Sequence, residues 1–131
     1  MLRQNNTLTS ISLKKYSFGD HGANEIAVAL RDNTALETLD VSSNNIGRDG
    51  AASFGEALKV NRTLRRLNLD HNGIQDEGLL ALVNSLLQVC CIAQPPVFGL
   101  RLDGLVLGVS AVRVASPLQA CSPYWWNLPI D

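Results

Sequence analysis

Three stretches of the sequence share one pattern: LTSISLKKYSFG at residues 8–19, LETLDVSSNNIG at residues 36–47, and LRRLNLDHNGIQ at residues 64–75. Equivalent positions in consecutive stretches lie 28 residues apart. Apolar and polar residues alternate around Ile11, Leu39 and Leu67, which is typical of a strand with one buried face. A fixed period over three copies indicates a repeat protein whose neighbouring units bury a common core.

The second half of each repeat has the period of a helix. After Gly50, apolar residues recur at every fourth position, at Phe54 and Leu58, as they do on the buried side of a short helix. We therefore expect an α/β solenoid of about three repeats, with parallel strands on the concave face and helices on the convex face. The predicted repeats are 5–32, 33–60 and 61–88.

These residues carry a family resemblance. The pattern L-x-x-L-x-L-x-x-N-x-I, followed by a glycine and a helical stripe, resembles a leucine-rich repeat over about residues 5–88. The 28-residue length resembles the ribonuclease-inhibitor-like class. The lead-in at residues 33–36 and at residues 61–64 is similar to that of NOD-like receptor repeats.

Asn44 and Asn72 occupy the asparagine position of this pattern. The resemblance implies that they point inward and bond to loop backbone groups of their own and adjacent repeats, forming a structural ladder. A buried amide is tolerated when it is hydrogen-bonded, so Asn44→Ala is expected to cost about 1–3 kcal/mol. Tyr16 takes this position in the first repeat, so either that repeat is degenerate or the ladder ends there.

The residues between the buried strand positions face away from the helices, and we call this side of the sheet the strand face. It is polar and of mixed charge, which favours a protein–protein interaction module, and Arg66 is the best candidate for an anchor. The other interpretation is that these side chains are simply solvated. The candidate partner-binding residues are Ser12, Lys14, Asp40, Ser42, Arg66, Asn68 and Asp70.

The sequence also allows two other functions. A Ran-type GTPase-activating fragment would place an arginine near the transferred phosphoryl group, and Arg48, between a strand and a helix, is the candidate. A truncated or alternatively spliced product without independent function is the other. His21 and His71 fall at different positions of the repeat and do not form a catalytic pair, so no enzyme activity is predicted.

Composition limits the remaining classes of function. The 131 residues carry a net charge of −1, which gives no electrostatic case for nucleic acid or for an anionic membrane. The first residues lack an apolar signal region, and three cysteines without a C-x-x-C motif favour a reducing compartment. We expect a cytoplasmic protein with no cofactor and no bound metal.

The segment 89–131 departs from the repeat. It holds all five prolines, all three cysteines and both tryptophans, and only four charged residues. A fourth copy would place its strand near Pro95, where proline disrupts ladder pairing. We expect an apolar tail that is poorly ordered or forms a partial cap, with residues 100–109 as a candidate hairpin. Association of the tail with a membrane is the lesser alternative. Self-association through uncapped ends of the stack is also possible.

Overall fold

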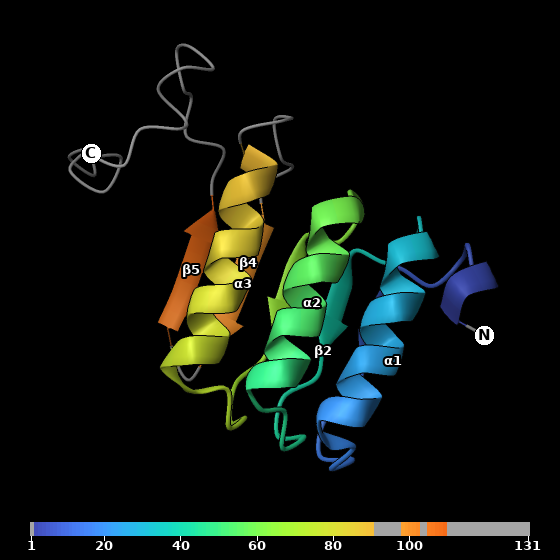
Figure 1. The fold of residues 1–131 in the computed structure, drawn as a ribbon. Helices are drawn as coiled ribbons and strands as arrows, with labels where there is room; N and C mark the ends of the chain where they lie inside the picture. The colour runs from blue at the N-terminus through green and yellow to red at the C-terminus, as the bar shows by residue number, and fades with distance from the viewer. Residues whose placement is uncertain (1, 91–97, 103–104, 110–131) are drawn as a thin grey trace.

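The computed structural model describes residues 2–90, 98–102 and 105–109, which form a sheet covered by helices on one face (Figure 1). Each strand of the first three repeats has only three residues, and each is followed by a helix of 13 to 16 residues. The elements are η1 (Leu2–Gln4), β1 (Ser10–Ser12), α1 (Gly19–Asp32), β2 (Thr38–Asp40), α2 (Arg48–Val60), β3 (Arg66–Asn68), α3 (Gln75–Cys90), β4 (Phe98–Leu102) and β5 (Leu105–Val109).

The strands follow one another across the sheet in chain order, from β1 to β5. The pairs from β1 to β4 are parallel, and β5 is antiparallel to β4. Ile11, Leu39 and Leu67 are direct neighbours in the sheet, so the 28-residue period of the sequence is the register of the strands. The expected α/β repeat solenoid is confirmed.

The core lies between the sheet and the helices. Leu39 and Leu67 point into it from β2 and β3, and they are fully or almost fully buried. Phe54 of α2 and Leu82 of α3 meet them from the helical layer, each without exposed surface. Because each repeat contributes one strand and one helix, neither layer could bury this surface without its neighbours.

Gly50 shows why the apolar face of each helix begins with a glycine. A Cβ atom at this position would lie 2.6 Å from the Ile46 side chain, 2.6 Å from the Asp20 carboxylate and 2.9 Å from the Ala23 Cβ. Two of these groups belong to α1, so the missing side chain allows α1 and α2 to pack closely. Gly78 of α3 occupies the same position, and a Cβ there would lie 3.0 Å from the Arg48 Cα atom of α2.

The fourth parallel strand lies later in the chain than a regular fourth repeat would place it. β4 begins at Phe98, and Leu67 pairs with Leu100, so this repeat is five residues longer than the others. A strand centred on Pro95 would have lacked a backbone N–H for the ladder. β4 and β5 form the antiparallel pair considered for residues 100–109. The rest of the tail, including Trp125 and Trp126, lies outside the described residues.

The helices of the described ranges are all too short or too polar to cross a membrane. The same residues bring no three histidine, cysteine or acidic side chains together in a way that could hold a metal ion.

Candidate functional site on the strand face

A single row of side chains crosses the strand face over four strands. Ser12, Asp40, Asn68 and Arg101 are paired neighbours in the sheet. Because parallel strands lie about 4.8 Å apart, the row spans about 14 Å. Ser12 and Arg101 are exposed at its two ends, and Asp40 and Asn68 are partly buried between them.

Asp40 is the centre of a polar network on this row. One carboxylate oxygen accepts hydrogen bonds from the Ser42 hydroxyl at 2.7 Å and the Ser42 backbone N–H at 3.1 Å. The other lies 3.0 Å from the Lys14 Nζ and accepts a hydrogen bond from the Asn68 amide at 3.2 Å. Burial raises the pKa of Asp40, but the hydrogen bonds from Ser42 and Lys14 outweigh it and hold the pKa below its ordinary value of 3.8.

This network makes the stability of the protein sensitive to acid. A carboxylate whose pKa is lowered by folding stabilises the folded state above its unfolded pKa and loses that contribution as the pH falls through the folded pKa. The free energy of unfolding should therefore fall more steeply from about pH 5 to about pH 3 in the parent protein than in Asp40→Asn. Urea unfolding over a series of pH values measures both slopes, and equal slopes would contradict the role of Asp40.

Ser42 and Asp70 are buried, in contrast to an interpretation of the whole strand face as a solvated surface. The Asp70 carboxylate forms an ion pair with Arg101 of β4, which links the third repeat to the next strand. The Ser42 hydroxyl donates its hydrogen bond to the Asp40 carboxylate. Of the seven candidate partner-binding residues, Ser12, Lys14 and Arg66 are the ones that the structure leaves exposed.

Asn44 ties three successive repeats together. It has no exposed surface. Its amide nitrogen donates to the Leu13 carbonyl at 2.5 Å and to the Val41 carbonyl at 2.9 Å. Its amide oxygen accepts from the Tyr16 and Ser17 backbone N–H groups at 2.8 and 3.0 Å. Its own backbone N–H donates to the Asn72 side chain at 2.8 Å.

Asn72 repeats this arrangement one coil further along. Its amide oxygen also accepts from the Ile46 backbone N–H at 3.1 Å, and its amide nitrogen donates to the Leu69 and Val41 carbonyls at 2.9 and 3.1 Å. Tyr16, which takes the asparagine position in the first repeat, is exposed and contributes its backbone N–H to the ladder.

A second asparagine ladder, which the sequence analysis missed, runs along the other end of the strands. Asn33 donates to the Leu2 and Asn5 carbonyls at 2.7 and 3.0 Å and accepts from the Leu36 backbone N–H at 2.7 Å. Asn61 makes the equivalent bonds 28 residues later, donating to the Leu30 and Asn33 carbonyls at 2.7 and 2.9 Å. The signal was present, because Asn5, Asn33 and Asn61 keep the period of the repeat.

Acidic and basic groups also connect the helix starts. The Asp20 carboxylate at the start of α1 accepts from the Gly47 and Gly50 backbone N–H groups at 2.6 and 2.9 Å, so it caps α2 rather than its own helix. Arg48, the candidate for GTPase activation, is 2.8 Å from the Glu77 carboxylate of α3. The hydrogen bond that Arg48 donates to the Glu77 carboxylate raises the pKa of Arg48. The structure thus gives this arginine a partner inside the protein.

Comparison with known proteins assigns the repeats. Residues 32–55 and residues 60–83 match a family model described as Leucine Rich repeat. The second and third repeats therefore match the leucine-rich-repeat pattern. Among solved structures, one described as Leiomodin-1 Actin-Binding Site 2 (ABS2) is similar, with a TM-score of 0.65 and 16% sequence identity. The match covers 91% of this chain and 80% of that chain, and it shows a shared fold. No curated protein matches the sequence significantly.

Proposed function

We propose that the protein is a non-enzymatic protein-binding module and that its partner contacts the strand face. The observation that carries the proposal is the row from Ser12 to Arg101, in which four adjacent strands present polar side chains on one face of the sheet. The two asparagine ladders hold the loops at both ends of these strands. A face held in this way keeps its side chains in place, which lowers the entropic cost of binding.

The similar structure supports this function at the level of the fold. In leiomodin-1, a solenoid of this kind forms an actin-binding site, so the fold is used there for protein binding. The partner does not transfer at 16% identity, because function resides in the side chains of the face rather than in the fold.

We also infer the class and the setting of the repeats from the sequence. The 28-residue period and the full helix in each repeat support the ribonuclease-inhibitor-like class, with a lead-in of the NOD-like receptor type. The cysteine pattern supports a reducing compartment and hence a cytoplasmic protein. Self-association through the ends of the stack remains part of this proposal, since Leu8 of the first repeat is exposed.

Site-specific photo-crosslinking tests the proposal. A photoreactive side chain placed at Ser12 on the strand face should give discrete adducts with another protein in cell lysate. The same group at Asn24, which is exposed on α1, serves as the matched control and should give none of these adducts. Equal labelling from both positions, or no adduct from Ser12, would overturn the assignment of the strand face.

A further inference from the structure

Charge is unevenly divided between the two sides of the protein. The three helices carry seven carboxylates and three cations, whereas in the described residues the strands and the three residues on either side of each carry five cations and three carboxylates. The helical carboxylates are Asp20, Glu25, Asp32, Asp49, Glu56, Asp76 and Glu77, with Arg31, Arg48 and Lys59 as the cations. On the strand side the cations are Lys14, Lys15, Arg65, Arg66 and Arg101, and the carboxylates are Glu37, Asp40 and Asp70.

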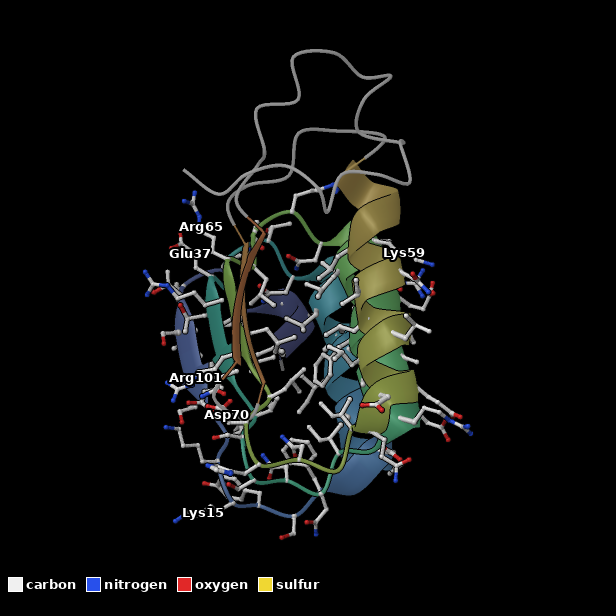
Figure 2. The ribbon with its side chains drawn as sticks, turned by 90° about the vertical axis from the view of Figure 1, so that its left-hand side faces the viewer. Lys15, Glu37, Lys59, Arg65, Asp70 and Arg101 are labelled. Carbon is white, nitrogen blue, oxygen red and sulfur yellow. The ribbon has the colours of Figure 1, made fainter. Side chains whose placement is uncertain are left out.

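Two of the strand-side carboxylates are partly or fully buried, which increases the excess of positive charge on the surface of this side. Asp70 is buried against Arg101, and Asp40 is partly buried against Lys14. Glu37 is therefore the exposed carboxylate of this side in the described residues. In Figure 2, Glu37, Arg65, Arg101 and Lys15 lie on the strand side, and Lys59 lies beyond the helices on the opposite side.

The cations remain available to a partner. Arg66 is exposed on β3, and the described part of the chain contains no ion pair for it or for Arg65 and Lys15. Even the paired cations keep more than half of their side-chain surface, with 53% exposed for Lys14 and 59% for Arg101. A ligand on this face would meet positive charge at several separate points.

The spacing of these points identifies an extended ligand. Lys14 follows β1, Arg66 lies on β3 and Arg101 lies on β4, so the backbone positions of Lys14 and Arg101 are separated by about three strand spacings, or about 14 Å. A ligand that contacts all three cations must therefore cross several strands. An extended peptide advances about 3.3 Å per residue, so acidic side chains about four residues apart would reach both ends.

We propose that the strand face binds an acidic, extended segment of a partner protein, with Arg66 and Arg101 as its main contacts. The proposal rests on the proposed function and adds the chemistry of the partner. Guanidinium groups suit it because each can bind a carboxylate through two parallel hydrogen bonds. Nucleic acid is disfavoured because the chain has a net charge of −1, so a long polyanion gains no general electrostatic attraction beyond the strand face.

Fluorescence anisotropy with the full chain tests this proposal. The probe is a labelled peptide of alternating glutamate and serine, and the comparison peptide has lysine in place of glutamate. The glutamate peptide should bind, with an affinity that falls as salt is added, and the lysine peptide should not. Arg66→Glu should weaken binding of the glutamate peptide about tenfold.

Arg31→Glu is the matched control, because it makes the same change of charge on exposed α1. Its affinity for the glutamate peptide should stay within about twofold of the parent, and circular dichroism should show both variants folded. Equal weakening by both variants would overturn the proposal by showing an effect of net charge alone. Equal binding of the lysine peptide, or tighter binding of an oligothymidylate, would also overturn it.

The two proposals fail in different ways. Adducts from Ser12 together with no binding of the glutamate peptide would retain the strand face as a protein-binding surface and reject an acidic partner. Absence of adducts from Ser12 would reject the strand face itself, and the acidic partner with it.

Discussion

Replacing Leu36 with alanine is expected to lower the free energy of unfolding by about 3 kcal/mol. Leu36 precedes β2, has no exposed surface and packs in the core of the stack. Truncation removes buried apolar surface and leaves a cavity that the neighbouring repeats fill only in part. Urea or thermal unfolding followed by circular dichroism measures the loss.

Leu8→Ala is the matched control for Leu36→Ala. Leu8 occupies the same position of the first repeat but is 47% exposed, so its truncation is expected to cost less than about 1 kcal/mol. Both variants shorten a leucine to an alanine. They differ because a preceding repeat covers Leu36, whereas no preceding repeat covers Leu8. Similar losses for both would contradict a core formed by stacking.

Replacing Asn44 with alanine is expected to cost about 3 kcal/mol, the upper end of the range for one unsatisfied buried group. The substitution removes the acceptor of the Tyr16 and Ser17 backbone N–H groups and the donor to the Leu13 carbonyl. Because these groups belong to the preceding repeat, the contact between the first two repeats should weaken most. Hydrogen exchange at Tyr16 and Ser17 should accelerate in the variant.

Asn24→Ala provides the comparison for this prediction. Asn24 is exposed on α1, and alanine has the higher helix propensity, so this variant should be as stable as the parent or slightly more stable. An Asn44→Ala variant that melts with the parent would contradict the role of the ladder. Unchanged exchange at Tyr16 and Ser17 would contradict its placement between repeats.

Much of the fold follows from periodicity in the sequence. Leu39 and Leu67 are 28 residues apart and pair directly in the sheet, and Phe54 lies on the buried stripe expected for its helix. Asn44 is buried where the repeat pattern directs it. Periodicity succeeds here because each repeat has the same length, so one register accounts for every pair of neighbours from β1 to β3.

The strand face could be predicted only in part. Ser42 and Asp70 alternate with buried residues in the sequence, as Ser12 and Arg66 do, yet they are buried. Alternation reports which side of a sheet a residue occupies, and it does not report whether a neighbour from another strand covers it. Asp70 is buried and forms an ion pair with the exposed Arg101, which lies on a strand outside the regular repeat.

The amino-acid sequence alone determined the period, the strand and helix of each repeat, and the residues that form the core, because burial of apolar side chains has a local pattern. Only the tertiary structure decided that Asp20 caps the next helix, that Asn33 and Asn61 form a second ladder, and that β4 pairs five residues later than the repeat predicts. The first two features depend on polar groups of different coils meeting in space. The 28-residue period of Asn5, Asn33 and Asn61 marks the donors of the second ladder but does not say which backbone groups they bond.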